Sequence, residues 1–175
     1  VEGDLGMRVS ARSTAQAGAR SGVVDVAEFA KITDGRLEAY AEQLTLQPEH
    51  LPQSAEEARL DALLAGICVG QACARHAGRL STVYTPDGEV KVQTGRDLSA
   101  VARVIGSGGW LSRAQDFDPA PWFAAQAIDP RGRVVLVPRR FDYYRDEACL
   151  FPLLANLARE FPEAAARAGI RQLKH

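Results

Sequence analysis

The sequence predicts an α/β domain in which helices pack on a sheet. Short apolar runs rich in β-branched residues alternate along the chain with segments of helical periodicity. A capping signal opens a long helix at Ser54, and the turn at 86–88, Pro-Asp-Gly, joins two runs that are typical of strands. Strands interleaved with helices over 175 residues fit a single α/β domain of ordinary size.

The N-terminal third is predicted to be mainly helical. The chain begins at Val1 inside the segment VEGDLGMR, without an initiator Met, and we therefore expect it to be a fragment of a longer protein. Apolar residues then recur at helical spacing, and Pro48 and Pro52 interrupt the pattern. The helices expected here cover residues 8–17, 23–32 and 36–44.

The clearest expected element is a helix over residues 54–78. Ser54 and Glu57 form a capping box, which satisfies free N–H groups at a helix start, and Gly78 marks the end. Gly66 and Gly70 lie four residues apart on one face of this helix. Glycine inside a helix costs about 1 kcal/mol relative to alanine, so a close backbone approach should compensate. We expect a sheet to pack there, with a ligand contact as the alternative.

The second half of the chain is predicted to alternate between strands and helices. The turn at 86–88 predicts a hairpin, and an apolar run leads into four residues that contain three glycines at 106–109. Pro152 and Pro162 suit the first turns of two helices. The expected strands are 80–85, 89–94 and 133–138, and the expected helices are 122–128, 151–160 and 162–173. Residues 98–105 are expected as helix or strand, with a buried strand in the apolar run just before the glycines.

Composition excludes several classes of protein. Hydrophobic residues make up 46% and charged residues 25%, which argues against disorder and fibrous repeats. The formal net charge of −1 provides no general attraction to nucleic acid or anionic lipid, and no apolar run reaches the roughly 18 to 20 residues of a membrane helix. We expect a cytoplasmic protein with neither partner. Three cysteines without a C-x-x-C pair predict buried free thiols and no zinc site.

The segment VIGSGG, residues 104–109, is the sharpest candidate for a binding site. Glycine lets the backbone turn sharply and approach a flat ring or a phosphate, because no Cβ intervenes. The segment matches neither G-x-G-x-x-G nor the P-loop, so it supports no Rossmann or Walker site. From these residues alone, a ligand contact and a plain strand-to-helix turn stay equal alternatives.

Other polar residues have weaker functional interpretations. Glu2 and Asp4 could hold a hydrated Mg²⁺ or a ribose, although turn chemistry is the commoner role. Arg75 and His76 suit the C-terminus of a helix, where positive charge is favourable. The segment DYYRDE, residues 142–147, is expected to serve capping and surface roles. No G-x-S-x-G and no nucleophile with a histidine partner is found, so hydrolase chemistry is not indicated.

Taken in order, five segments resemble the C-terminal part of the MutL (GlmL) family, the accessory or reactivating proteins of glutamate (methylaspartate) mutase. This family is unrelated to the mismatch-repair protein of the same name. The resemblance extends over nearly the whole chain. The segments are VEGDLGMR, CARHAG, TGRDLSAVARVIGSGGWL, LVPRRFDYYRDEACLFPLLANLA and FPEAAARA.

The resemblance implies a fold, a cofactor and a set of site residues. The family belongs to the actin, Hsp70 and sugar-kinase superfamily, whose two ribonuclease-H-like lobes clamp ATP. Residues 1–175 would form the adenosine-side C-terminal lobe, incomplete, with its sheet flanked by helices. Gly106, Ser107, Gly108 and Gly109 would then pass close to adenine and ribose, and Asp4 would lie in the turn that follows the second phosphate motif.

The implied activity is that of a chaperone-like ATPase, with ATP or ADP and Mg²⁺ as cofactors and the subunits of an adenosylcobalamin-dependent mutase as partners. The Asp-x-Gly phosphate motifs of the superfamily are absent from this sequence and should lie upstream of Val1. We therefore expect this chain alone not to hydrolyse ATP. Two alternatives stay open, namely a non-catalytic adaptor that binds the mutase and a fragment of a sugar-kinase-type phosphotransferase.

Overall fold

The computed structural model describes residues 2–20 and 35–174 and divides them into two compact units. Unit 1 comprises residues 1–100 and 119–139, and unit 2 comprises residues 101–118 and 140–175. Both contain helices and strands, so the mixed α/β character is confirmed. The expectation that residues 1–175 form a single domain stays a prediction.

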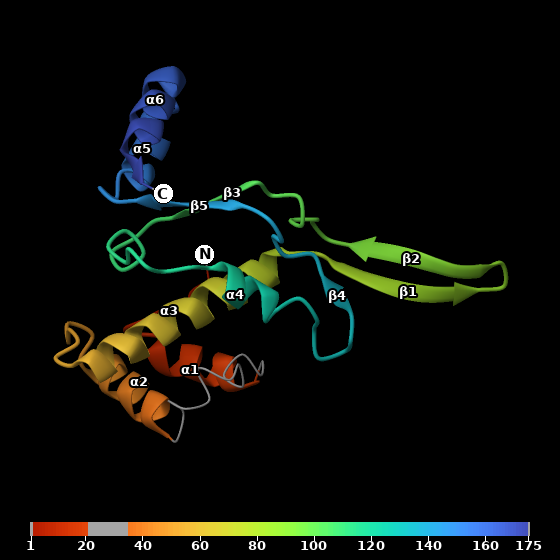
Figure 1. The fold of residues 1–175 in the computed structure, drawn as a ribbon, viewed down its shortest axis with the longest axis horizontal. Helices are drawn as coiled ribbons and strands as arrows, with labels where there is room; N and C mark the ends of the chain where they lie inside the picture. The colour runs from red at the N-terminus through yellow and green to blue at the C-terminus, as the bar shows by residue number, and fades with distance from the viewer. Residues whose placement is uncertain (1, 21–34, 175) are drawn as a thin grey trace. The chain divides into compact units, whose positions relative to one another are not determined.

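Unit 1 is built on three helices, which lie against one another in Figure 1. Leucine side chains from α2 and α3 and alanines from α1 are buried between the helices, and their removal from water stabilises the unit. The expected helix at 23–32 lies outside the described residues. The helices are α1 (Ala11–Arg20), α2 (Arg36–Leu46) and α3 (Ala55–His76).

The start of α3 follows from the capping chemistry at Ser54. The Glu57 N–H donates to Ser54 Oγ at 3.1 Å, as the capping box predicts. The Glu57 carboxylate does not return to Ser54, because it accepts from the N–H of Gln53 at 2.7 Å and lies 3.1 Å from His50 Nε2. The return hydrogen bond of the capping box therefore involves Gln53 and not Ser54. The helix still starts where the sequence places it.

The two glycines of α3 make room for a helix and not for a sheet. A Cβ on Gly66 would lie 1.9 Å from the indole of Trp122, and a Cβ on Gly70 would lie 2.9 Å from the carbonyl oxygen of Trp122. Trp122 belongs to the short helix α4 (Ala120–Ala124), and its side chain is buried. The expectation of a close approach is thus correct, whereas the expected sheet partner is wrong.

Unit 1 also carries a three-stranded antiparallel sheet of order β2-β1-β4. Strands β1 (Arg79–Thr85) and β2 (Gly88–Thr94) form the hairpin predicted from the turn at 86–88. The expected strand at 133–138 is reduced to β4 (Val134–Val135). Leu136 still donates to the carbonyl of Gly78 in the same register, and Pro138 has no N–H to donate. In Figure 1 the hairpin extends away from α3.

Unit 2 is a small sheet followed by two helices. Strand β3 (Arg103–Gly106) pairs in parallel with β5 (Asp142–Asp146), and β5 pairs with the antiparallel β6 (Leu173–Lys174). Helices α5 (Phe151–Leu157) and α6 (Pro162–Gln172) begin at the predicted prolines. The sequence reasoning missed β5 and β6, whereas the strand that it expected just before the glycines is present as β3.

The three cysteines are free thiols, as expected. Cys68 and Cys73 are half-buried, and burial raises the pKa of Cys73 to about 11. Cys149 is exposed, which corrects the expectation that all three are buried. Within the described ranges, no helix is long and apolar enough to cross a membrane.

Candidate functional site

The glycine turn predicted as a binding site follows β3 directly, at the carboxyl end of a parallel strand pair. Gly106 is the last residue of β3 and lies opposite Arg145 of β5. Ser107, Gly108 and Gly109 leave the sheet at this edge. Ligands of α/β proteins bind preferentially outside the carboxyl ends of parallel strands, so the turn occupies a position suited to binding.

Two of the three glycines of the turn have a physical reason within the protein, and the third has none. A Cβ on Gly106 would lie 2.0 Å from the hydroxyl oxygen of Tyr143, so a side chain there would require the Tyr143 ring to move. Gly108 has a φ of 104°, which side chains rarely tolerate. Gly109 has neither constraint, since no atom lies within 4 Å of a Cβ built there. Gly109 therefore exposes bare backbone to open space.

The hydroxyl of Ser107 is engaged inside the protein. It donates to Asp146 Oδ2 at 2.6 Å. Asp146 is fully buried and also accepts from the backbone N–H groups of Leu150 at 2.9 Å and Phe151 at 3.0 Å, at the start of α5. The Gln172 amide at the end of α6 donates to the other oxygen at 2.5 Å. Asp146 thus links the glycine turn to both helices of unit 2.

These hydrogen bonds decide the ionisation of Asp146. Burial alone would raise the pKa of its carboxyl group, because the charged form loses solvation. The hydrogen bonds donated by Ser107, Phe151, Leu150 and Gln172 stabilise the charged form and hold the pKa below its ordinary value. Asp146 is therefore an anion at neutral pH, and its carboxylate caps α5 as the sequence analysis expected of this segment.

Two buried donors without an acceptor lie beside the turn. Arg145 is 8% exposed and makes one long hydrogen bond, 3.3 Å, from Nη1 to the carbonyl oxygen of Ser112. Arg145 Nε and the Tyr143 hydroxyl are buried without a hydrogen-bond partner in the described part of the chain. Burial raises the pKa of Tyr143, and the charge of Arg145 partly offsets this shift. Sequence reasoning did not single out Arg145 as a buried residue.

An aromatic cluster follows the glycines. The rings of Trp110 and Phe117 meet edge to face at 5.3 Å, and Phe117 meets Tyr143 in the same way at 6.2 Å. Such pairs contribute about 0.5 to 1.5 kcal/mol beyond burial. Trp110 is half-buried and directly follows Gly109, so its fluorescence should respond to a molecule bound at the turn.

The two acidic residues of the N-terminal segment are held by an arginine. Arg75 donates from both terminal nitrogens to Asp4, at 2.6 and 2.7 Å, and also contacts Glu2. This bidentate pair lowers the pKa of Asp4 and raises that of Arg75. Arg75 therefore does more than favour the helix terminus, which was its expected role. Across residues 2–20 and 35–174, no three His, Cys, Asp or Glu side chains form a potential metal site.

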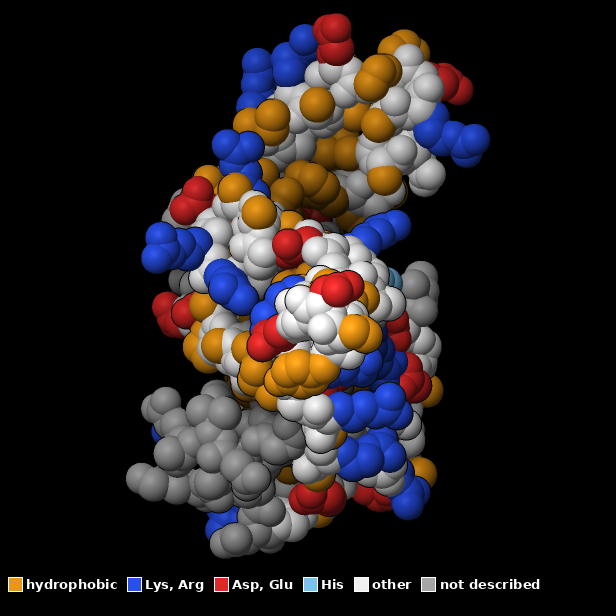
Figure 2. Space-filling view, turned by 90° about the vertical axis from the view of Figure 1, so that its right-hand side faces the viewer, with side chains coloured by type: hydrophobic (Ala, Val, Ile, Leu, Met, Phe, Trp, Pro, Cys, Tyr) orange, Lys and Arg blue, Asp and Glu red, His pale blue; other side chains and the backbone are white. Residues whose placement is uncertain are grey.

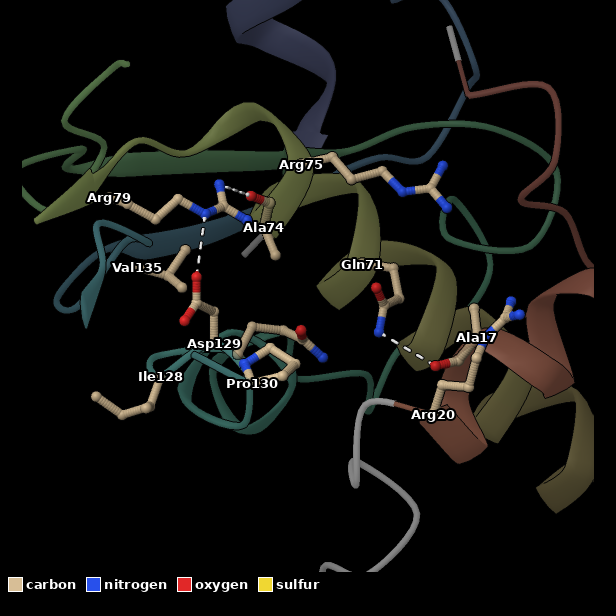
Figure 3. Close-up of a pocket in the computed structure, with 11 residues that line it drawn as sticks. Ala17, Arg20, Gln71, Ala74, Arg75, Arg79, Ile128, Asp129, Pro130 and Val135 are labelled. Carbon is tan, nitrogen blue, oxygen red and sulfur yellow. Dashed lines mark hydrogen bonds and ion pairs between the residues drawn. The ribbon is translucent and has the colours of Figure 1, made fainter. Parts of the chain in front are cut away.

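A hollow of about 280 Å³ in unit 1 lies near this arginine (Figure 3). Gln71 donates weakly to the Ala17 carbonyl across one wall at 3.5 Å, and Arg79 faces Asp129 on the other side at 4.0 Å. Arg75 is paired with Asp4 and Glu2, and Asp129 also accepts from Arg133 at 2.8 Å. Arg75 is thus compensated by two carboxylates, whereas Arg79 shares the single charge of Asp129 with Arg133.

The predicted site residues fall into different units. Gly106, Ser107, Gly108 and Gly109 lie together in unit 2, whereas Asp4 lies in unit 1. The structure gives the glycines a common turn and gives Asp4 an arginine partner. Their predicted contacts with a nucleotide stay predictions.

Comparison with known proteins identifies one family. The family model described as MutL protein matches residues 1–173. Protein MutL of Clostridium tetanomorphum is 32% identical over 167 residues, which is 95% of the chain. The chain spans only 35% of the length of that relative. No solved structure matches the chain significantly.

Proposed function

Because the chain belongs to the MutL protein family, we propose that it is the adenosine-side lobe of an actin-like, chaperone-like ATPase that maintains or reactivates an adenosylcobalamin-dependent mutase of the glutamate mutase type. The cofactor would be ATP or ADP with Mg²⁺, and the partners would be the mutase subunits. Since the chain spans about a third of its relative, hydrolysis belongs to the proposed activity of a longer protein.

The observation that carries this proposal is the open backbone at Gly109. Gly106 and Gly108 are explained by packing and by backbone conformation, and neither needs a ligand. Gly109 has no such internal reason, and it lies at the carboxyl edge of β3 and β5 beside Trp110. A flat adenine or a ribose could approach the backbone there to van der Waals distance.

The residues present fit the nucleoside better than they fit the metal. Bare glycine backbone and neighbouring aromatic rings suit a flat, partly apolar ligand. Mg²⁺ requires oxygen ligands that are not already neutralised, whereas the carboxylates of Asp4 and Glu2 are paired with Arg75. We therefore assign no Mg²⁺ ligand to this chain.

Nucleotide would act on a mutase only through a change of shape. A ligand shifts an equilibrium between two conformations only by its different affinity for each of them. In the proposed mechanism the chain contributes the nucleoside contact, and a second lobe contributes the phosphate contacts. Binding by this chain alone should therefore be weak and should depend on the adenosine moiety.

The test is a titration of Trp110 fluorescence with adenosine and with Mg-ADP. Saturable quenching is expected with both ligands and should disappear in Trp110→Phe. Gly109→Val should abolish binding without loss of fold, because the new side chain enters open space. Gly108→Val should also weaken binding, because a side chain is strained at its positive φ. Its control is Gly88→Val, which has a positive φ and open surroundings as well but lies on the hairpin, and which should leave binding unchanged. No response in a folded protein, or unaltered binding by Gly109→Val, would overturn the proposed site and favour the adaptor.

A further inference from the structure

Within the part of the chain that the structure describes, the hairpin of β1 and β2 presents an unpaired edge. The strand order β2-β1-β4 places β2 at the end of its sheet. All seven residues of β2 are exposed, and β4 covers only Arg79 and Leu80 of β1. A two-stranded hairpin is at best marginally stable in water by itself. Long exposed edges with apolar residues also tend to pair with another strand.

One face of the hairpin is apolar. Val83 lies directly opposite Val90, and Val92 lies two residues further along the same face. These valines are 43%, 46% and 39% exposed. In the view that faces the hairpin tip, hydrophobic side chains lie at the surface beside charged ones (Figure 2). The ribbon thus offers a strip of valines next to a free edge.

The other face carries a compact charge pattern. Lys91 Nζ lies 2.8 Å from Glu89 on the same strand and donates to Thr82 of β1 at 2.7 Å. Thr85 and Gly88 are paired across the tight turn, where the two residues form a hydrogen-bonded pair. Hydrogen-bonded and non-hydrogen-bonded pairs then alternate along the ladder. The N–H and C=O groups of Glu89, Lys91 and Gln93 therefore point away from β1. The backbone groups free for pairing therefore belong to residues that flank Val90 and Val92.

These features restrict how the edge could pair with an identical edge. In an antiparallel pair, outward-facing residues of one strand must lie opposite outward-facing residues of the other. Centring the pair on Glu89 or on Lys91 would place like charges opposite each other, which is destabilising. Centring it on Val90 places Glu89 opposite Lys91 twice, and brings the two Val90 side chains together. Centring it on Val92 places Lys91 opposite Gln93 without an opposite charge.

We propose that β2 is a self-pairing edge through which two copies of this chain form an antiparallel four-stranded sheet, centred on Val90, with Glu89 of each copy opposite Lys91 of the other. The twofold interface uses the same edge on both copies, so it closes after two and does not propagate. It joins six valines on one face and four complementary charges on the other. This assembly does not depend on the proposed nucleotide site.

Analytical ultracentrifugation of the chain over a wide concentration range tests the proposal. We expect a monomer–dimer equilibrium that weakens with salt, because the paired charges are exposed. Glu89→Lys and Lys91→Glu should each raise the Kd of dimerisation at least about tenfold, because each places like charges opposite each other. The double swap should restore it. All these positions are exposed, so at concentrations where the parent chain is monomeric the circular dichroism and melting of the variants should match it.

A cysteine crosslink tests the register. Cα atoms of a non-hydrogen-bonded antiparallel pair lie about 4.5 Å apart, within the range of a disulfide. Under mild oxidation, Val90→Cys in a Cys149→Ser background should give a crosslinked dimer. Val92→Cys is the matched control, since two such residues would be about 13 Å apart at 3.3 Å per residue.

The outcomes separate the possibilities. A monomer at all concentrations would overturn the proposal, as would a dimer that is insensitive to the charge swaps. Crosslinking through Val92→Cys in place of Val90→Cys would show a different register and would also overturn it. Retained dimerisation in Gly109→Val is expected, because the nucleotide site and the hairpin edge are independent.

Discussion

Among the described residues, each of the two units buries one aspartate, and the two units compensate its charge in different ways. In unit 1, Asp61 accepts two hydrogen bonds from the guanidinium of Arg8, at 2.9 and 2.8 Å, and one from Tyr40 at 3.0 Å. In unit 2, Asp146 has no cation among its described partners. Its charge is held by a hydroxyl, an amide and two backbone N–H groups.

The difference teaches what each carboxylate does. The Arg8–Asp61 pair joins the segment before α1 to α3, so it fastens elements that are already packed by apolar residues. Asp146 joins the glycine turn to α5 and α6, where only Ala165 of the two helices is a buried apolar side chain. Unit 2 therefore depends more strongly on its polar network than unit 1 does.

Removing Arg8 should have the largest effect. Arg8→Leu leaves the Asp61 carboxylate buried, with Tyr40 as its one remaining hydrogen-bond partner among the described residues. Loss of one member of a buried pair costs about 3 to 5 kcal/mol. Urea denaturation followed by circular dichroism measures the change in the free energy of unfolding. The matched control is Arg12→Leu on α1, whose exposed pair with Glu42 should contribute less than about 1 kcal/mol. Equal effects of the two substitutions would contradict the assigned role of Asp61.

Asp146→Asn should have the next largest effect, and it should be confined to unit 2. An asparagine amide presents N–H groups where the carboxylate accepts hydrogen bonds, so at least one donor loses its acceptor. Loss of a hydrogen bond to a charged group costs about 1.5 to 3 kcal/mol. Denaturation followed by Trp110 fluorescence reports on unit 2. Asp142→Asn at the exposed start of the same strand should change stability by less than about 0.5 kcal/mol.

Low pH should remove the same contribution reversibly. The pKa of Asp146 lies below its ordinary value when the protein is folded, so its stabilising contribution is fully present above the unfolded pKa of about 3.9. It is lost as pH falls through the folded pKa. The stability difference between the parent chain and Asp146→Asn should therefore shrink below pH 4. A difference that stays constant from pH 5 to pH 2 would show that Asp146 acts through shape alone.

The sequence revealed the elements whose signals are local. Ser54 predicts the start of α3 because a capping residue acts on N–H groups three residues away. The turn at 86–88 predicts the hairpin because a tight turn fixes the register of both strands. The glycine turn was likewise placed correctly after a strand, since the apolar run and the glycines are adjacent.

The elements that depend on distant partners could not be predicted. Strand β5 reads as a polar segment, and its parallel partner β3 is far away in the sequence. Nothing in the sequence pattern indicates that Asp146 is the hub for Ser107 and Gln172, since those bonds form only after the sheet and both helices are assembled. The two glycines of α3 announce a close contact, but only the fold identifies Trp122 as the partner.

Ser107→Ala should have the smallest effect and should be the most informative about the turn. Asp146 keeps three other donors, so the loss of one hydroxyl should cost about 1 kcal/mol in Trp110-monitored denaturation. Adenosine affinity should not change if the hydroxyl stays on Asp146 when the ligand binds. If Ser107→Ala loses more adenosine affinity than its loss of stability accounts for, the Ser107 hydroxyl must leave Asp146 and bond the ligand when adenosine binds. Asp146 would then sense occupancy of the turn directly, because the carboxylate that caps α5 would lose the hydrogen bond from Ser107.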